Sequence, residues 1–190
     1  MNTFLVFIAQ SHPVTIVVFG WLSLYFLITL WIYLYKTLTL GDWLSREKHN
    51  VALLSTSPVS LPKNTILNDL LLSRNAIDSD LLQVWKTKAL QKATRGLVFL
   101  SIVSSTAPFI GLFGTVVEIL EAFSHLGGGN VSFDIIAPVI SKALVATACG
   151  ILTAIPAYSF YLLLKRKSYN IGVCIQMQIN LMLSSQRSNL

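Results

Sequence analysis

The chain has 190 residues, of which 54% are hydrophobic and 12% are charged, and its formal net charge is +6. A soluble domain carries about 25% charged residues, so this composition argues against an ordinary water-facing surface. The basic residues lie beside long uncharged runs and form no stripe interleaved with aromatic residues. This distribution argues against nucleic-acid binding and is typical of a membrane protein.

Three long uncharged runs predict three transmembrane helices. The first, Val14–Tyr35, has 22 residues, which is enough to cross a bilayer as a helix. No Lys or Arg precedes it and Lys36 follows it, the reverse of the charge order in a cleavable signal peptide. The second run, Leu97–Val117, has 21 residues, and the third, Ala143–Leu164, has 22.

The positions of the basic residues predict how these helices are oriented. Residues 36–96 hold nine Lys or Arg and residues 165–190 hold four, whereas residues 1–35 and 118–134 hold none. The positive-inside rule therefore predicts an N-terminus outside and a C-terminus in the cytoplasm. The expected fold is an all-α, polytopic membrane protein with four parts. These are 1–35, the N-terminus and first span; 36–96, a cytoplasmic helical insertion; 97–164, the second and third spans; and 165–190, a cytoplasmic C-terminal helix.

The cytoplasmic segments carry their own helix signals. Two prolines predict a linker over Leu54–Lys63, and Asp78-Ser79-Asp80 resembles a helix start. The helix that begins there is expected to run unbroken through Arg95 into the second span. Residues 168–183 predict an amphipathic continuation of the third span. The apolar residues that recur near helical period around the second span's extension are Ile66, Leu70, Ile77, Leu81, Val84, Trp85 and Leu97.

The sequence offers no conventional active site. The three histidines are scattered, and none lies at metal-ligand spacing from Cys, Asp or Glu. Cys149 lies within an uncharged run, and Cys174 lies in a segment predicted to be cytoplasmic, where thiols stay reduced. There is no phosphate loop or nucleophile motif. We therefore expect no enzymatic activity, no metal site and no cofactor.

Small residues recur at helical spacing in the second and third spans, which lets helix backbones approach closely in lipid. Part of this surface is predicted to pack against a partner helix or another subunit. An alternative, in which the stripe joins the two spans within one subunit, stays open. The residues expected to pack against the partner are Ala107, Gly111, Gly114, Ala143, Gly150 and Ala154.

Two threonines, Thr115 and Thr147, interrupt these stripes with hydroxyl groups. A threonine in a membrane helix commonly bonds its own backbone. The other interpretation is that both hydroxyls line a polar lumen, and the residues alone leave the two open.

Two segments resemble a known family. Residues Thr106–Val116 (TAPFIGLFGTV) and Ala137–Pro156 (APVISKALVATACGILTAIP) resemble the signature spans of the ExbB/TolQ proton-channel proteins, which are relatives of MotA. The resemblance covers roughly Arg95–Arg166. Thr115 and Thr147 match the family's pore threonines, which implies that both lie on the proton pathway.

The resemblance also implies an assembly in the bacterial inner membrane. It implies a homopentamer whose second and third spans surround the single helices of ExbD- or TolR-like partner subunits, each carrying a membrane aspartate. Proton flow would then drive a TonB- or TolA-like protein that energises outer-membrane transport or envelope maintenance. The alternatives are a MotA-like flagellar stator subunit and a non-conducting membrane assembly protein.

The chain departs from the family's pattern at two charged positions. Lys142 stands where the family usually has a glutamate in the third span, and Glu118 stands where it more often has a glycine. Glu118 directly follows the second uncharged run and Lys142 directly precedes the third. Both are therefore expected at the outer edge of the hydrocarbon layer that the spans cross. An ion pair between them is the preferred hypothesis, and independent snorkelling of the two charges is the alternative.

Overall fold

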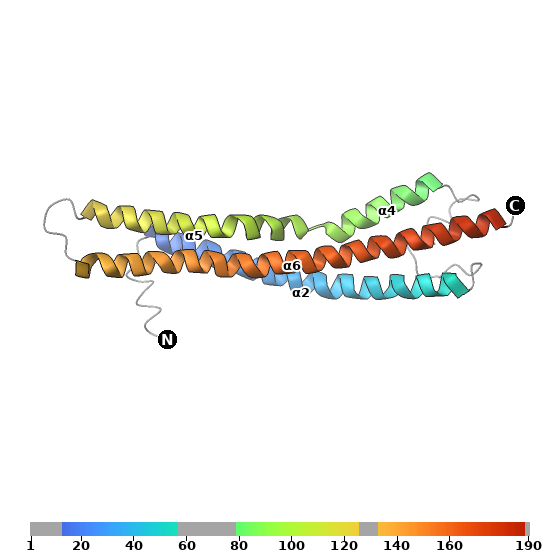
Figure 1. Cartoon of the computed structure of the whole chain (residues 1–190), viewed down its shortest axis with the longest axis horizontal. Helices are drawn as coiled ribbons and strands as arrows, with labels where there is room; N and C mark the ends of the chain where they lie inside the picture. The colour runs from blue at the N-terminus through green and yellow to red at the C-terminus, as the bar shows by residue number, and fades with distance from the viewer. Residues whose placement is uncertain (1–12, 57–78, 126–132, 189–190) are drawn as a thin grey trace. The chain divides into compact units, whose positions relative to one another are not determined.

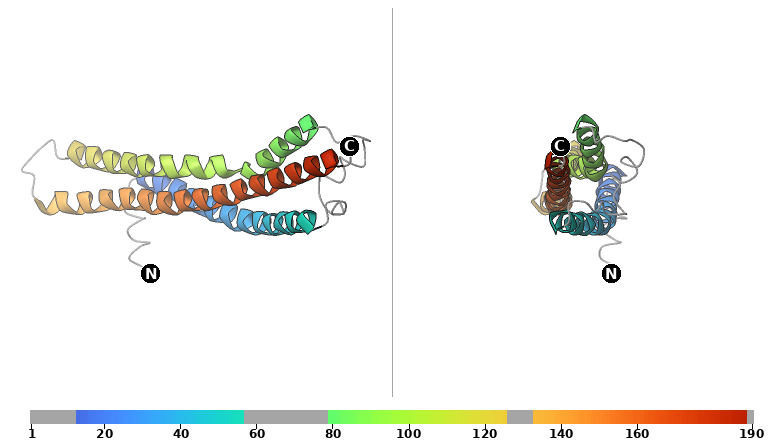
Figure 2. Two further views of the ribbon diagram at one scale, coloured as in Figure 1. Left: turned by 45° about the vertical axis from the view of Figure 1, so that its right-hand side comes forward. Right: turned by 90° about the vertical axis from the view of Figure 1, so that its right-hand side faces the viewer.

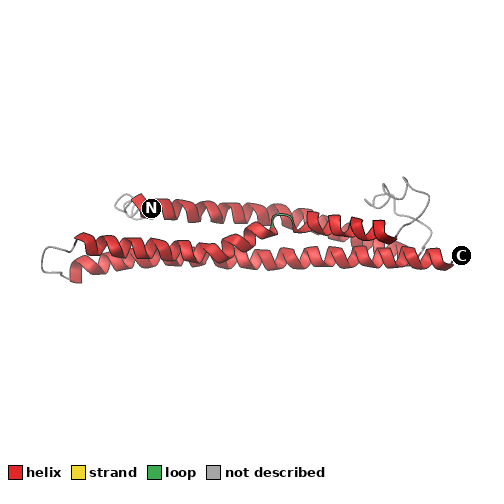
Figure 3. Ribbon diagram, turned by 90° about the horizontal axis from the view of Figure 1, so that it is seen from above, coloured by secondary structure: helices red, strands yellow, loops and turns green. Residues whose placement is uncertain are grey.

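The computed structural model describes residues 13–56, 79–125 and 133–188, and these residues form long α-helices (Figure 1). They are α2 (Pro13–Thr56), α4 (Ser79–Thr94), α5 (Leu97–His125) and α6 (Phe133–Ser188). No strand occurs in the described ranges, as Figure 3 shows. Helices α2, α5 and α6 are long and apolar enough to cross a membrane. The predicted all-helical, multi-pass membrane protein is therefore confirmed.

The helices divide between two compact units. The first, here called the membrane unit, consists of residues up to Ile32 together with Val98–Tyr161. The second, here called the basic unit, consists of Tyr33–Leu97 and Leu162–Leu190. The basic unit holds all the lysines and arginines except Lys142. Since the uncharged runs lie almost wholly in the first unit, it is the one that a bilayer would surround.

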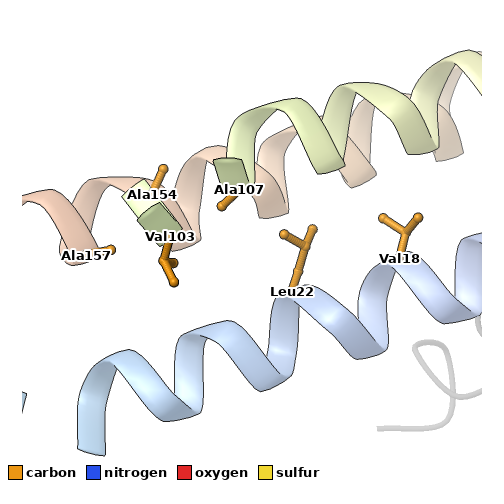
Figure 4. Packing of buried hydrophobic residues seen from close by; sticks show 6 residues of the cluster. All are labelled: Val18, Leu22, Val103, Ala107, Ala154 and Ala157. Atoms are coloured by element: carbon orange, nitrogen blue, oxygen red, sulfur yellow. The ribbon is translucent and has the colours of Figure 1, made fainter. Parts of the chain in front are cut away.

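The membrane unit packs α2 against α5 and α6 through a core of apolar residues. In Figure 4, Val18 and Leu22 of α2 point toward small and branched residues of the other two helices. Outward-facing positions carry large apolar side chains such as Trp31, Phe109 and Leu152, as expected of a lipid-facing surface. The buried core residues are Val18, Leu22, Val103, Ala107, Ala154 and Ala157.

The basic unit brings parts of α2, α4 and α6 side by side (Figure 2). Residues 168–183 of α6 have a buried apolar face, which confirms the predicted amphipathic continuation of the third span. Inside this unit, the Gln178 amide donates to Glu47 Oε2 at 2.6 Å, and the Trp43 indole donates to Glu47 Oε1 at 3.0 Å. Two hydrogen bonds thus engage a carboxylate that would be costly to bury alone.

One boundary differs from the prediction. The helix expected to run unbroken through Arg95 instead ends at Thr94, and α5 begins at Leu97. Gly96 between them has a φ of 90°, a left-handed conformation that ends helices and that glycine adopts readily. The Lys36 ammonium donates to the carbonyls of Lys92 at 3.3 Å and Ala93 at 3.4 Å. A cation therefore satisfies carbonyls that the helix end leaves unpaired.

Other local predictions fared unevenly. The helix start predicted at Asp78-Ser79-Asp80 agrees with the structure at its last two residues, because α4 begins at Ser79 and has Asp80 in its first turn; Asp78 lies outside the described ranges. The linker predicted from Leu54 is wrong at its beginning, since α2 continues to Thr56; residues 57–63 lie outside the described ranges, as do Ile66, Leu70 and Ile77. Val84 is 52% exposed, so it does not belong to the buried face of α4. That face consists of Leu82, Trp85, Ala89 and Ala93.

Candidate functional site

Helices α5 and α6 approach each other most closely where two glycines meet. A Cβ atom on Gly111 would lie 2.7 Å from the Ala146 carbonyl oxygen, and one on Gly150 would lie 2.7 Å from the Ala107 carbonyl oxygen. Real Cβ atoms do not approach backbone atoms this closely, and backbone cannot move aside as a flexible side chain can. The two glycines therefore permit the contact between α5 and α6.

The small residues of α5 and α6 are buried in contacts between helices of this one chain. Ala107 and Ala143 are fully buried, and a Cβ atom on Gly114 would meet Val18 Cγ1 of α2 at 3.1 Å. All six residues predicted to contact a partner helix are buried. The structure thus has the arrangement named as the alternative, in which the stripe joins spans of one subunit. A single chain does not test contact with a partner, which stays a prediction, but this face is already filled.

The two predicted pore threonines lie together at the α5–α6 contact. Thr115 Oγ1 and Thr147 Oγ1 are 2.5 Å apart, and either can be the donor. Thr115 Oγ1 also lies 3.2 Å from the Gly111 carbonyl oxygen of its own helix and 3.2 Å from the Ala143 carbonyl oxygen of α6. Thr115 therefore contacts backbone carbonyls, as the first interpretation expects, and also the hydroxyl of Thr147. That both hydroxyls line a polar lumen stays a prediction.

The close helix packing explains why these hydroxyls meet. Thr115 follows Gly111 by four residues, and Thr147 precedes Gly150 by three, so each lies one turn from a contact glycine on the same face. Both threonines are half-buried, so the pair reaches the surface of the membrane unit. Their exposed neighbours Val116 and Leu144 are apolar. The pair is thus a small polar site on an otherwise apolar face.

The chemistry available to this pair is hydrogen bonding. Each threonine hydroxyl has one proton to donate and lone pairs to accept, and neither hydroxyl ionises in the physiological range. Two protons are shared among two hydroxyl oxygens and two carbonyl oxygens, so the donor direction can reverse. The site can therefore orient or relay a proton but cannot store one.

Glu118 lies on the buried face of α5, which the sequence did not reveal. It follows Gly111 and Gly114 at intervals of seven and four residues, so all three share one face of the helix. Its side chain is only 8% exposed, and its Oε2 atom has no hydrogen-bond partner. The signal available in the sequence was this spacing from the two glycines.

The predicted ion pair between Glu118 and Lys142 stays a prediction. Lys142 is half-buried on α6 and takes part in an interaction of its own. The described residues contain no group of three or more His, Cys, Asp or Glu side chains placed to hold a metal ion.

Comparison with known proteins gives one family throughout. The sequence model of the MotA/TolQ/ExbB proton channel family matches residues 65–177. The chain is 49% identical over 191 residues to the biopolymer transport protein ExbB-like 1 of Helicobacter pylori, covering 98% of this chain and 100% of that protein.

Shorter matches link the chain to two further members. It is 48% identical over 64 residues to the Tol-Pal system protein TolQ of Haemophilus influenzae, covering 33% of this chain and 28% of TolQ. It is 47% identical over 72 residues to the biopolymer transport protein ExbB of Neisseria gonorrhoeae, covering 37% of this chain and 33% of ExbB.

Proposed function

This chain belongs to the MotA/TolQ/ExbB proton channel family, and on that premise we propose that it is the channel or stator subunit of a proton-driven motor in the bacterial inner membrane. The match to ExbB-like 1 extends over nearly the whole chain, and further matches are to ExbB and TolQ. These relatives favour a motor that energises outer-membrane transport or envelope maintenance through a TonB- or TolA-like protein.

The observation that carries the proposal is the contact between Thr115 and Thr147. Two hydroxyls and two carbonyl oxygens come together where two helices that are long and apolar enough to cross a membrane pack against each other. Polar groups in membrane helices are uncommon and often mark ion or proton pathways. Because both threonines reach the surface of the membrane unit, a group on another helix has access to them.

The hydroxyl pair requires a proton carrier from elsewhere. We assign this role to an aspartate on the single membrane helix of an ExbD- or TolR-like partner, held within a homo-oligomer that we propose to be a pentamer. The membrane potential supplies about 2.3 kcal/mol per proton for each 100 mV, and only an assembly that couples proton entry to proton exit can use it.

Two other functions compete with this one. A MotA-like flagellar stator belongs to the same family, but the matches to named proteins given above are to ExbB and TolQ types. A non-conducting assembly protein would also use glycine-mediated packing, and the Gly111–Gly150 contact fits it equally well. The hydroxyl pair favours conduction, because packing alone does not require polar groups at the contact.

Proton flux in liposomes distinguishes these functions. Vesicles with this chain alone should acidify under an imposed potential no faster than empty vesicles. Vesicles with this chain and its single-span partner should acidify faster, and a partner lacking the aspartate should abolish the difference. Sustained flux from this chain alone, or no flux from the pair, would contradict the proposal.

We also propose the orientation that the basic residues predict, with the basic unit in the cytoplasm. A cysteine at Gly128, in a variant without Cys149 and Cys174, should react with an impermeant maleimide in intact cells. One at exposed His49 should react only after permeabilisation. Asn50 is a poorer choice, because it is buried and would stay unlabelled on either side.

A further inference from the structure

The basic unit contains a cavity that the proton pathway does not use. Its volume is about 420 Å³, within the range of about 300–1,000 Å³ typical of small-molecule sites. It lies between α2 and α4, where the side-chain ammonium of Lys36 on α2 donates a hydrogen bond to the Lys92 carbonyl of α4. The lining residues are Leu38, Thr39, Asp42, Trp43, Arg46 and Lys92.

The cavity lies at the membrane surface on the side predicted to be cytoplasmic. With a helical rise of 1.5 Å per residue, Leu38 begins about 4.5 Å beyond the end of the first uncharged run at Tyr35. Lys92 lies five residues before the second run begins at Leu97, and its carbonyl accepts a hydrogen bond from Lys36, the residue directly after the first run. A bilayer's headgroup layer is roughly 5–8 Å thick on each side. By the same rise the Arg46 backbone lies about 16 Å beyond Tyr35 and outside this layer. Helical side chains lean toward the N-terminus, so the long Arg46 side chain is directed back toward the membrane.

The charged groups of the cavity are available to a ligand. Within the part of the chain that the structure describes, no hydrogen bond or ion pair engages the charged ends of Arg46, Lys92 or Asp42. All three residues are exposed. The cavity therefore offers two cations and one carboxylate, an arrangement complementary to a group that carries both a phosphate and an ammonium.

Two of the other lining residues, Leu38 and Trp43, present apolar surface. Leu38 is 71% exposed although it lies outside the uncharged run, a position suited to contact with acyl chains. The Trp43 indole is held by its hydrogen bond to Glu47, which in turn is held by the buried Gln178. Tryptophan is enriched at membrane–water interfaces because its ring is apolar and its N–H is polar. An apolar wall beside paired charges fits an amphipathic ligand better than free phosphate.

We propose that this cavity binds the headgroup of a membrane phospholipid that bears a primary ammonium. Its phosphate lies between Arg46 and Lys92, and its ammonium donates to Asp42. Its acyl chains leave past Leu38 into the bilayer. Lys36 keeps Lys92 in position through the backbone carbonyl, and it adds a further positive charge nearby. This site is separate from Thr115 and Thr147 and does not depend on the function proposed for them.

Native mass spectrometry of the delipidated, full-length oligomer tests the proposal by titration with three lipids. Phosphatidylethanolamine should bind more tightly than phosphatidylcholine, whose quaternary ammonium has no proton to donate, and more tightly than phosphatidylglycerol, which has no ammonium. Arg46→Gln and Lys92→Gln should each weaken binding of all three lipids about fivefold. Asp42→Asn should weaken phosphatidylethanolamine binding most, because its ammonium loses both a charge partner and a charged hydrogen-bond acceptor, and it should not weaken phosphatidylglycerol binding.

Two matched variants serve as controls. Lys48 on α2 and Lys88 on α4 are exposed lysines on the same helices as Arg46 and Lys92 that do not line the cavity, so Lys48→Gln and Lys88→Gln should leave binding unchanged. Equal losses in these controls would overturn the proposal, as would equal binding of phosphatidylethanolamine and phosphatidylcholine. Soluble glycerophosphoethanolamine should compete poorly; displacement of the lipid at matched concentration would show that the bilayer is not the source. If no lipid is retained, for example because another subunit of the oligomer fills the cavity, the proposal would also be contradicted.

Discussion

Gly111 of α5 and Gly150 of α6 pack against each other so closely that a Cβ atom on Gly150 would lie 3.1 Å from the Gly111 Cα atom. Lipid tails are as apolar as the helices, so the hydrophobic effect does not hold membrane helices together. Van der Waals contact between closely packed helices therefore contributes more to their association than it does in water. The contact also sets the distance between Thr115 and Thr147, which lie one turn away.

Substitution of either glycine by alanine should therefore destabilise the membrane unit. Because the added Cβ would meet backbone atoms, we expect Gly111→Ala and Gly150→Ala each to cost about 1–3 kcal/mol, as overpacked cores do. The measurement is unfolding in detergent followed by circular dichroism. Gly20→Ala is the control, since nothing lies within 4 Å of its added Cβ. A loss of stability with Gly20→Ala as large as with Gly150→Ala would contradict the packing argument.

Removal of both hydroxyls should abolish function without unfolding the protein. An interhelical hydrogen bond in a membrane contributes only about 0.6 kcal/mol on average, so Thr115→Val with Thr147→Val should assemble normally. If the pair relays protons, flux in liposomes with the partner should fall to that of empty vesicles.

A threonine elsewhere on α5 provides the comparison. Thr106 is half-buried like the pair, but its hydroxyl bonds only the Ile102 carbonyl of its own helix at 2.8 Å, so Thr106→Val should conduct normally. Normal flux in the Thr115, Thr147 double variant would exclude a pore role for these hydroxyls.

The break between α4 and α5 should depend on the conformation of Gly96. An alanine in the left-handed region costs roughly 1–2 kcal/mol, so Gly96→Ala should lower the free energy of unfolding by about that amount. Gly41 lies inside α2 with nothing within 4 Å of an added Cβ, so Gly41→Ala should be neutral or stabilising. Thermal denaturation of both variants tests the difference. An unchanged melting temperature for Gly96→Ala would show that the helix can pass through this position.

A double-mutant cycle tests the ion pair predicted between Glu118 and Lys142. If the two charges interact, Lys142→Glu alone should harm assembly more than Lys142→Glu combined with Glu118→Lys. Lys142→Glu replaces the positive charge on α6 by a carboxylate, so that α5 and α6 each carry a negative charge at these positions. The swap restores opposite charges. Oligomer yield and partner-dependent flux are the measurements. Additive effects would favour two charges that act independently.

The sequence predicted the spans better than the contacts among them. Uncharged runs of sufficient length marked three membrane helices, because an unsatisfied backbone or charge in hydrocarbon is costly. The resemblance around Thr106–Val116 implied the family that the comparisons confirm. The break at Gly96 was not predicted, because a single glycine in a helical pattern can adopt either a helical or a positive φ, and the sequence alone does not distinguish them.

By itself, the sequence determined that the chain spans a membrane and which family it belongs to. It also determined that Thr115 and Thr147 lie on the same helix faces as the small residues. Only the tertiary structure decided which neighbour covers each stripe: α5 and α6 of one chain enclose Gly111 and Gly150, and α2 covers Gly114. It also decided that Glu118 faces inward. Helical periodicity places residues on a common face, but the partner of that face depends on shape complementarity between helices far apart in the chain. That complementarity exists only once the helices have packed.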